Sequence, residues 1–474
     1  MRLLSPHPAA MTSTLAALMI VLGPSVAHGQ SASQTLGALA QLSGTNGCLV
    51  DRSSTRDDCA PTRALLGPGP FLGSRAVAIS PDGRQVYVAS STSDAVAILR
   101  RNARTGVLTQ ASGKAGCIAE KGAQGCAWAR GLNGPNSVAV SPDGRNVYVT
   151  SRNSDDVSIL RRNASTGALT QLSGAAGCIS GVAAVPGCAA GRALDGPDVV
   201  AVSPDGRNVY VGSFFGNAVV TFTRDASTGA LAQPADTTGC LAAATAGCAT
   251  GIALGAPEGL AVSADGASVY VATAASNAVL TLARNASTGA LTQATDGTGC
   301  IANAVVTGCT TGVTVAGANA LAVSPGDDDV YATSLVSNSV TSFTRTAGSG
   351  LLAQQQGTSA CAIYLLAVGC SLARSLSAPE GVAVSPDGAT VYAAAYNSGT
   401  IATFVRSTTG ALKQQSGRLG CVTGKDEPDC ATGRALSGVS SIAVSPDGRH
   451  VYAAAFKSNA LTVFARTTTT RTRE

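Results

Sequence analysis

The 474-residue chain is poor in charged residues (12%) and aromatic residues (4%), and it contains 55 glycines and 14 cysteines. Its formal net charge of +5 is small for this length, and the sequence has no basic stripe with interleaved aromatic residues, which argues against nucleic-acid binding. A composition rich in Ala, Val, Ser and Thr favours short strands and tight turns over helical bundles.

Residues 1–29 have the features of a secretory signal segment. Arg2 supplies a positive charge, Thr14–Val21 forms a short apolar region, and Ala27–Gly29 offers small residues at a cleavage position. The apolar run is short for a transmembrane helix. A retained anchor is the alternative, but we expect no integral membrane segment and a secreted or periplasmic protein.

A unit of four expected strands recurs along residues 30–466. One complete copy predicts strands at 138–141, 146–151, 156–162 and 168–172, each bounded by turn residues. A Ser-Pro-Asp-Gly turn joins the first two strands and is followed by a tyrosine. The turn sequence is altered in two of the seven copies. Its serine recurs at Ser80, Ser141, Ser203, Ser263, Ser324, Ser385 and Ser445. Short antiparallel strands in seven repeats predict an all-β, seven-bladed β-propeller with four-stranded blades.

The ends of the repeat region predict how the ring closes. The first three strands occur seven times, but the fourth follows only six of them, and Leu36–Gly44 matches the missing copy. We therefore expect this N-terminal strand to complete the last blade, which would remove the exposed edges of an open array. A linear solenoid, the alternative, would leave it unpaired. Residues 467–474 are expected to form a disordered tail, and the fifth repeat, with its altered turn Ser324–Asp327, is expected to deviate most.

The cysteines fall in seven close pairs, one in each repeat. An even number at a regular period in an exported chain predicts disulfides, and pairing within each repeat closes the shortest loops. Each such loop contributes roughly 2–3 kcal/mol on a chain-entropy model. Zinc binding, the alternative, requires CxxC spacing or histidines that the loops lack. The pairs are Cys48–Cys59, Cys117–Cys126, Cys178–Cys188, Cys240–Cys248, Cys300–Cys309, Cys361–Cys370 and Cys421–Cys430.

The Ser-Pro-Asp-Gly-x-x-Val-Tyr-Val core and the turns at Ser276–Val279 and Ser337–Val340 resemble known repeats. They are similar to the YVTN-type repeats of the lactonase-like seven-bladed β-propellers, a superfamily that includes 6-phosphogluconolactonase and the so-called 3-carboxymuconate cyclases. The resemblance covers nearly the whole expected mature chain and implies the fold. The shared residues belong to turns and strands, so no catalytic residue of the family carries over.

One position differs in residue type among the seven repeats. It is the first residue expected in the innermost strand. We expect these side chains to meet at the mouth of the central channel, on the face that carries the cysteine loops. They are Arg75, Asn136, Asp198, Glu258, Asn319, Glu380 and Ser440. Carboxylate and amide oxygens suit calcium, so the candidate ligands are Asn136, Asp198, Glu258, Asn319 and Glu380. The arrangement resembles, by position alone, the calcium site of six-bladed lactonase propellers.

Two other interpretations of this ring are open. Its residues could line a water-filled channel and cap strand ends, and Arg75 could supply the positive charge that a metal would otherwise bring.

Further candidates lie in loops on the same face. The loops between the second and third strands contribute Arg152, Phe214, Phe215, Tyr396, Phe456 and Lys457. Trp128 follows Cys126 and could stack on a sugar or peptide, or pack under its own loop. The candidate ligand-binding set is therefore Arg75, Trp128, Arg152, Tyr396 and Ser440.

Histidine chemistry has little support in this sequence. His7 and His28 lie in the expected signal segment and His450 lies beside a turn on the opposite face, so a Ser-His-Asp or zinc site is not favoured. We expect a monomeric, secreted binding or interaction protein that takes a small molecule, glycan or protein on its disulfide-stapled face and binds no nucleic acid. The alternative is a lactonase-like hydrolase with calcium at the channel mouth.

Overall fold

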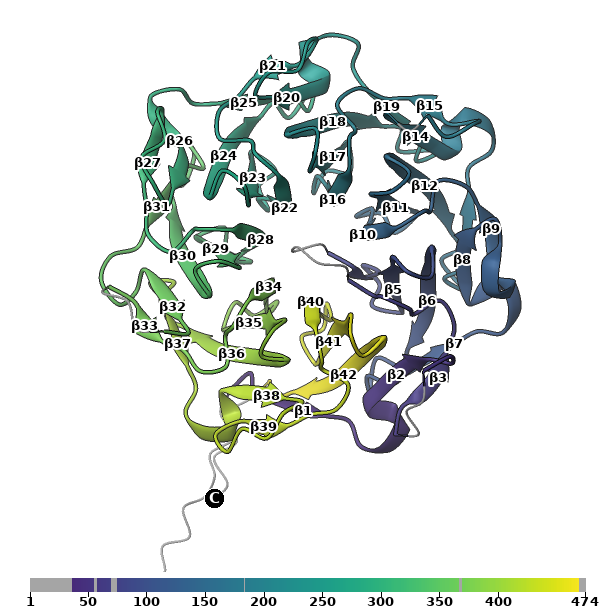
Figure 1. Cartoon of the computed structure of the whole chain (residues 1–474). Helices are drawn as coiled ribbons and strands as arrows, with labels where there is room; N and C mark the ends of the chain where they lie inside the picture. The colour runs from purple at the N-terminus through teal and green to yellow at the C-terminus, as the bar shows by residue number, and fades with distance from the viewer. Residues whose placement is uncertain (1–35, 55–57, 70–74, 183, 366–368, 469–474) are drawn as a thin grey trace, which may run out of the picture.

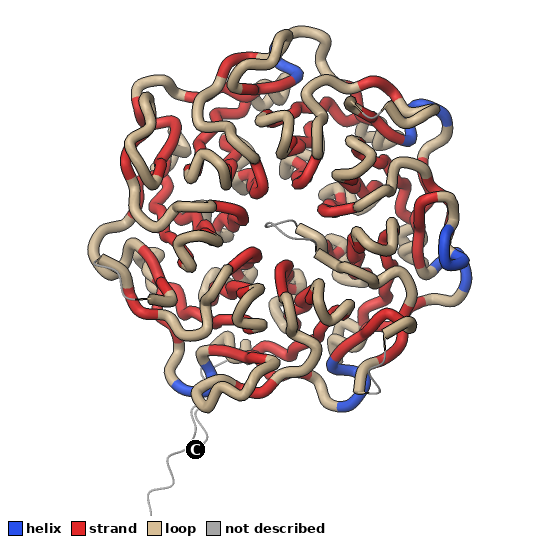
Figure 2. The backbone as a smooth tube through the Cα atoms, viewed as in Figure 1, coloured by secondary structure: helices blue, strands red, loops and turns tan. Residues whose placement is uncertain are grey.

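The computed structural model describes residues 36–54, 58–69, 75–182, 184–365 and 369–468. The expected signal segment, residues 1–29, lies outside this range. Seven β-sheets surround a central axis as the blades of a propeller, which confirms the predicted fold (Figure 1). Within the described residues there is no α-helix. Short 3-10 turns lie at the rim (Figure 2): η1 (Gly44–Gly47), η2 (Gly113–Ala115), η3 (Ala123–Gly125), η4 (Gly174–Gly177), η5 (Thr237–Gly239) and η6 (Gly417–Leu419).

Three antiparallel strands form the inner part of each blade. The innermost strands are β4 (Val77–Ile79), β10 (Pro135–Val140), β16 (Pro197–Val202), β22 (Pro257–Val262), β28 (Ala318–Val323), β34 (Pro379–Val384) and β40 (Val439–Val444). The second strands are β5 (Gln85–Ser90), β11 (Asn146–Ser151), β17 (Asn208–Ser213), β23 (Ser268–Thr273), β29 (Asp329–Ser334), β35 (Thr390–Ala395) and β41 (His450–Ala455). The third strands are β6 (Ala95–Arg101), β12 (Asp156–Arg162), β18 (Ala218–Arg224), β24 (Ala278–Arg284), β30 (Ser339–Arg345), β36 (Thr400–Arg406) and β42 (Ala460–Arg466).

Three shorter strands complete each blade, so the sheets have six strands and not the predicted four. In the blade of β10, the second half of β12 pairs with the predicted fourth strand, and its first half pairs with a strand of the cysteine loop. A last strand runs parallel to that one. The cysteine loop is therefore folded into the outer edge of the blade.

The outer strands have the following bounds. The fourth strands are β1 (Leu39–Gln41), β7 (Leu108–Gln110), β13 (Leu169–Gln171), β19 (Leu231–Ala232), β25 (Leu291–Gln293), β31 (Leu352–Gln354) and β37 (Leu412–Gln414). The fifth strands are β2 (Cys48–Asp51), β8 (Cys117–Glu120), β14 (Cys178–Ser180), β20 (Cys240–Ala242), β26 (Gly297–Ala302), β32 (Cys361–Ile363) and β38 (Cys421–Thr423). The sixth strands are β3 (Ala60–Thr62), β9 (Ala127–Ala129), β15 (Ala189–Ala190), β21 (Ala249–Thr250), β27 (Cys309–Thr311), β33 (Ser371–Leu372) and β39 (Ala431–Thr432).

All seven predicted disulfides are present, and each joins the fifth strand of a blade to the start of its sixth. The Cα atoms of every pair are 4.8 Å apart. Each disulfide therefore ties the two outermost strands of a blade together.

The N-terminal strand closes the ring, as predicted. β1 pairs with β42 in antiparallel register, with Leu39 opposite Arg466, so the first and last described strands share one blade (Figure 1). The pairing continues into the segment expected to be a tail. The amide of Thr467 donates to the Ala38 carbonyl at 3.0 Å, and its own carbonyl accepts from the Gly37 amide at 2.7 Å.

The hydrophobic core lies between neighbouring blades. Tyr148 and Ile159 of one blade pack with Val200, Val209 and Phe222 of the next in a single buried cluster. Because each blade is sandwiched between two others, both faces of its second strand are buried. This explains why these strands are apolar or small at nearly every position, without the alternation of a half-exposed strand.

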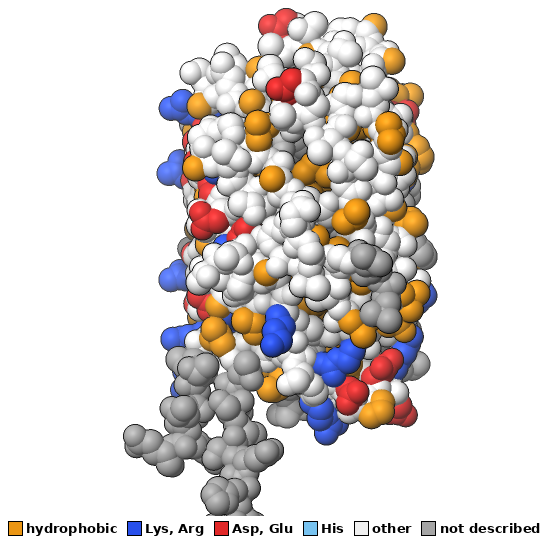
Figure 3. Space-filling model, turned by 90° about the vertical axis from the view of Figure 1, so that its left-hand side faces the viewer, with side chains coloured by type: hydrophobic (Ala, Val, Ile, Leu, Met, Phe, Trp, Pro, Cys, Tyr) orange, Lys and Arg blue, Asp and Glu red, His pale blue; other side chains and the backbone are white. Residues whose placement is uncertain are grey.

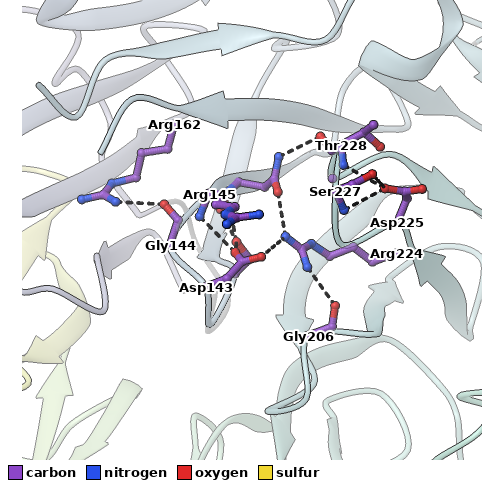
Figure 4. Close-up of polar contacts among 12 residues, drawn as sticks. Asp143, Gly144, Arg145, Arg162, Gly206, Arg224, Asp225, Ser227 and Thr228 are labelled. Carbon is purple, nitrogen blue, oxygen red and sulfur yellow. Dashed lines mark hydrogen bonds and ion pairs between the residues drawn. The ribbon is translucent and has the colours of Figure 1, made fainter. Parts of the chain in front are cut away.

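A polar contact that recurs in every blade joins it to its neighbour. The guanidinium of Arg224, which ends β18, lies 2.7 Å from Asp143 in the preceding blade (Figure 4). It also donates to the Tyr148 hydroxyl at 2.7 Å. That hydroxyl donates in turn to the Gly229 carbonyl at 2.9 Å. The same pairing of arginine with tyrosine joins Arg101 to Tyr452, Arg162 to Tyr87, Arg284 to Tyr210, Arg345 to Tyr270, Arg406 to Tyr331 and Arg466 to Tyr392.

The fifth repeat deviates in this contact, as expected. Its turn has Gly326 where the other turns have aspartate, and Arg406 pairs instead with Asp329. Asp327 takes the positive φ of 60° that glycine adopts in the other turns. The blade keeps its strands, and Asp329, the first residue of β29, supplies the carboxylate that Gly326 lacks.

A glutamine clamp at the rim was not predicted. The Gln171 amide donates to the Arg130 carbonyl of the preceding blade at 2.8 Å and accepts from the Arg130 amide at 3.1 Å. The equivalent glutamines make the same pair of bonds at all seven junctions. They are Gln41, Gln110, Gln171, Gln233, Gln293, Gln354 and Gln414.

Seen edge-on, the wall of the molecule displays mostly uncharged side chains, with charged ones along one edge and at the lower end of the view (Figure 3). In the described part of the chain, no helix has the length and apolar character needed to cross a membrane.

Candidate functional site

Six of the seven predicted ring residues lie at an irregularity in the innermost strand. In β10, Pro135 is opposite Ser151 and Ser137 is opposite Thr150, so Asn136 is the extra residue of a β-bulge. The same shift occurs at the equivalent position of five other blades. A bulge redirects a side chain out of the regular alternation. Asn136, Asp198, Glu258, Asn319, Glu380 and Ser440 are all 2% exposed or less.

Three neighbouring blades bring part of this ring together. The Asn136 amide donates to Oδ1 of Asp198, and Nη1 of Arg152 lies 3.6 Å from the same oxygen. Oδ2 of Asp198 and Oε2 of Glu258 are buried and have no hydrogen-bond partner among the described residues. A buried carboxylate oxygen without a partner costs folding free energy.

The ionisation of these carboxylates follows from their burial. Burial raises the pKa of Asp198 to about 7, although Arg152 and the Asn136 amide favour its charged form. Burial raises the pKa of Glu258 to about 9, and the negative charges of Asp198 and Glu380 raise it further. At neutral pH, Glu258 is therefore protonated and Asp198 is close to its midpoint.

The five candidate calcium ligands do not fit a calcium ion in this arrangement. Asn136 turns its amide nitrogen toward Asp198. Oδ1 of Asn319 accepts from the Thr333 hydroxyl at 2.7 Å, and its amide donates to the Pro379 carbonyl at 3.1 Å. Across the described residues, no three Asp, Glu, His or Cys side chains form a group that could hold a metal.

The cation beside the carboxylates is Arg152, and not Arg75 as the alternative interpretation suggested. The Arg75 side chain crosses the channel, and its Nη2 donates to the Leu321 carbonyl at 3.1 Å. Ser440 is also engaged elsewhere, because its hydroxyl donates to the Gly69 carbonyl at 2.9 Å.

A pocket of about 350 Å³ opens at the channel mouth above these groups. Its lining comes from the entrance of β10 and from the loops between the second and third strands of three blades. The lining residues are Ser91, Thr92, Gly134, Asn136, Arg152, Asn153 and Phe456. Asn136 and Arg152 both line the pocket and contact Asp198, so they connect the pocket to the buried carboxylates.

The Arg152 guanidinium is held between aromatic and acidic groups. It lies 4.0 Å from the ring centre of Phe214 and 4.8 Å from that of Phe215. Because Asp198 also contacts it, this side chain is oriented before any ligand arrives.

The remaining candidates lie apart from the pocket lining. Trp128 is 55% exposed in β9 at the rim, where the guanidinium of Arg130 lies 5.9 Å from its ring centre. Tyr396 is buried, with Nζ of Lys457 4.5 Å from its ring centre. Burial raises the pKa of Tyr396, and the Glu380 carboxylate adds to that effect.

Four lining residues were missed from the sequence: Ser91, Thr92, Gly134 and Asn153. The sequence signal that could have identified them was the variation in residue type among the loops between second and third strands. Ser91 stands where other repeats have Arg152, Phe214 or Phe456, and it lacked the charge or aromatic ring that drew attention to those residues.

Known proteins resemble the chain in sequence and in fold. Residues 124–186 and 179–307 match the protein family described as Lactonase, 7-bladed beta-propeller. No curated protein sequence matches the chain.

Three solved structures share its fold with a TM-score of 0.51. A putative 6-phosphogluconolactonase from Bacteroides uniformis is 20% identical, over 82% of this chain and 91% of that one. A periplasmic gluconolactonase from Pseudomonas aeruginosa is 17% identical, over 84% and 96%. Hydrazine synthase from Kuenenia stuttgartiensis is 17% identical, over 85% and 98%. The closed ring of blades identifies the chain as a seven-bladed β-propeller, and its segments 124–186 and 179–307 resemble the lactonase family that has this fold.

Proposed function

We propose that the protein is an exported binding protein that takes a small hydroxylated ligand of the sugar-acid class in the mouth pocket. The observation that supports this most is the combination of lining groups in one pocket: two hydroxyls, two amides, a guanidinium and an aromatic ring. Its volume of about 350 Å³ lies in the range of small-molecule sites.

The chemistry of the lining suggests the ligand class. Hydroxyls and amides can donate to and accept from the alcohol groups of a sugar. The oriented Arg152 can form a bidentate pair with a carboxylate or polarise a lactone carbonyl. The names of two similar structures, a gluconolactonase and a putative 6-phosphogluconolactonase, provide the first compounds to test.

Export is supported by the disulfides. Seven disulfides in one chain are typical of proteins in oxidising compartments, which favours the periplasm or the exterior of the cell. The gluconolactonase of similar fold is described as periplasmic.

A second candidate function, lactone hydrolysis, is favoured by Asp198. Its pKa of about 7 suits a general base at neutral pH, and two of its contacts line the pocket. In that reaction, the carboxylate would take a proton from water while the water oxygen attacks the lactone carbonyl carbon. The ring C–O bond would then break, and the departing oxygen would recover the proton. This scheme includes no metal.

Binding is tested by calorimetric titration of the purified protein with D-gluconate and glucono-1,5-lactone. We expect saturable binding, weakened at least about tenfold in Arg152→Met, because a charge-assisted hydrogen bond contributes about 1.5–3 kcal/mol. Arg207→Met is the matched control, since Arg207 is exposed on the opposite face. If neither compound binds, or if Arg152→Met binds equally well, the proposal is wrong.

Hydrolysis is measured separately, as acid release from the lactone at pH 7 above the spontaneous rate. If the protein is a lactonase, Asp198→Asn should lose about 100-fold or more in kcat while its gluconate affinity changes little. A chelator should leave the rate unchanged, and loss of turnover that calcium restores would support the metal-dependent alternative.

A further inference from the structure

The central channel contains a second cavity, of about 380 Å³, apart from the mouth pocket. Innermost strands from all seven blades line it with valine, alanine and isoleucine side chains. Among the described residues that line it, Arg75 alone carries a charge.

The cavity occupies the part of the channel that leads away from the mouth. Its lining includes Val140, Val202 and Val384, which end their strands next to the Ser-Pro-Asp-Gly turns. On the mouth side, Arg75 and Leu321 border a much smaller space of about 10 Å³. Arg75 therefore crosses the channel between the two spaces and forms the inner end of the larger cavity.

The charge of Arg75 is poorly compensated by the protein. Its guanidinium has five N–H donors, and its hydrogen bond within the described residues is the one to the Leu321 carbonyl. No described carboxylate pairs with it. The side chain is exposed, but both spaces that it borders lie inside the channel. Surrounding protein lowers the pKa of Arg75. A bound anion would accept hydrogen bonds from the guanidinium donors that face the cavity.

The walls of the cavity indicate what else the anion needs. Apolar side chains from seven strands surround the space beyond Arg75. Each innermost strand pairs on one side only, so its other edge presents backbone N–H and C=O groups toward the channel. A small, strongly hydrated dianion would lose its water shell here with one cation to replace it. A singly charged head with a short apolar chain matches both the single guanidinium and the walls.

We propose that this cavity is a binding site for an amphipathic monoanion, a carboxylate with a short alkyl chain whose head group contacts Arg75. The ligand would enter from the face of the Ser-Pro-Asp-Gly turns. This site does not depend on the mouth pocket or on the ligand proposed for it.

The test is calorimetric titration of the whole protein with hexanoate, with hexanol and inorganic phosphate as comparison ligands. We expect one hexanoate per chain, and affinity at least about tenfold weaker for hexanol, which lacks the charge. Arg75→Met keeps the alkyl stem and removes the charge, so it should lose hexanoate affinity by at least about tenfold. Arg207→Met, on an exposed arginine, should bind as the parent protein does.

A second variant and a competition experiment address the cavity itself. Ala139→Leu adds volume to the wall and should weaken hexanoate binding without removing a charge. Saturating gluconate should leave the hexanoate affinity unchanged, because the two sites are separate. The proposal is overturned if hexanoate does not bind, if Arg75→Met binds it equally well, if phosphate binds as tightly, or if gluconate competes.

Discussion

At the scale of single residues, the channel mouth combines burial with charge. Asp198 and Glu258 are almost completely buried, and each has one carboxylate oxygen without a partner among the described residues. Such groups destabilise the folded chain, and perturbed carboxylates of this kind concentrate at functional sites. These buried carboxylates beside the mouth pocket are therefore expected to serve the function of the protein at a cost in folding stability.

Glu258→Gln should stabilise the protein at neutral and alkaline pH. Because the pKa of Glu258 rises from 4.5 to about 9 on folding, the folded state holds a proton that the unfolded state has released. That cost is absent below about pH 4.5 and grows until about pH 9. At pH 7 the substitution should raise the free energy of unfolding by on the order of 3 kcal/mol.

Denaturant titrations of Glu258→Gln at pH 5 and pH 8 check this. The gain should be clearly larger at pH 8. Glu427→Gln, in an exposed loop, is the matched control and should change stability at neither pH. Equal stability of Glu258→Gln and the parent protein at pH 8 would contradict the protonated state inferred here.

At the scale of strands and turns, the repeated residues hold neighbouring blades together. The arginine that ends the third strand meets a carboxylate of the neighbouring blade at each junction, as Arg224 meets Asp143 in Figure 4, and it also contacts the recurring tyrosine of that blade. Residues that recur in every blade therefore indicate the fold, whereas the positions whose residue type differs from blade to blade indicate where the candidate site lies.

Removal of one tyrosine hydroxyl should destabilise its junction. Tyr148→Phe leaves Nε of Arg224 and the Gly229 carbonyl without their partner, and each buried unpaired group costs about 1–3 kcal/mol. We expect a lower melting temperature in calorimetry. Tyr364→Phe, at an exposed position, should melt as the parent does; an unchanged Tyr148→Phe would rule out the contact as a stabilising element.

His450 should make one junction sensitive to acid. Its Nδ1 lies 2.8 Å from Nη2 of Arg101 in the junction with the next blade, and Asp447 and Arg449 are close by. Burial and the Arg101 charge lower its pKa to about 4. The unfolded chain therefore binds a proton first as the pH falls from 6.5 toward 4, and stability is lost over that range, by on the order of 3 kcal/mol.

His450→Asn, which introduces the residue found at this position in other blades, should lessen that loss. Unfolding free energies at pH 7 and pH 4.5 provide the measurement. Gln85→Asn, at the matched position of another blade, should alter stability equally at both pH values. If His450→Asn and the parent protein lose the same stability between pH 7 and pH 4.5, the interpretation of His450 fails.

Much of the fold could be predicted from these repeated elements, and less of the site. The Ser-Pro-Asp-Gly turns and their tyrosines define seven blades because each has a fixed structural task. The strand Ala189–Ala190 could not be found, since two alanines have no periodicity. The ring position was found because Asp198 and Glu258 break a regular pattern. The pairing of Asp198 with Arg152 depends on a bulge and on a neighbouring loop, which spacing does not reveal.

At the scale of the whole molecule, ring closure creates the pocket. Phe456 belongs to the last blade and Ser91 to the first complete one, and they share a pocket because β1 pairs with β42. Their proximity therefore depends on the closed ring.

Deletion of residues 1–44 should open the ring at this seam. The outer part of β42 would then expose an unpaired edge, which promotes association with other chains. We expect a lower melting temperature and larger species in light scattering coupled to size exclusion, whereas deletion of residues 469–474 should alter neither. A monomeric deletion protein with the parent melting temperature would show that β1 is dispensable for closure.

The central claim, that the mouth pocket is the ligand site of this propeller, is tested most directly by a crystal structure grown with D-gluconate at saturating concentration. We predict density for one gluconate between Arg152 and Phe456, within hydrogen-bond distance of the Arg152 guanidinium and of Asn153. Gluconate bound at another place, or an empty mouth pocket under those conditions, would contradict the claim.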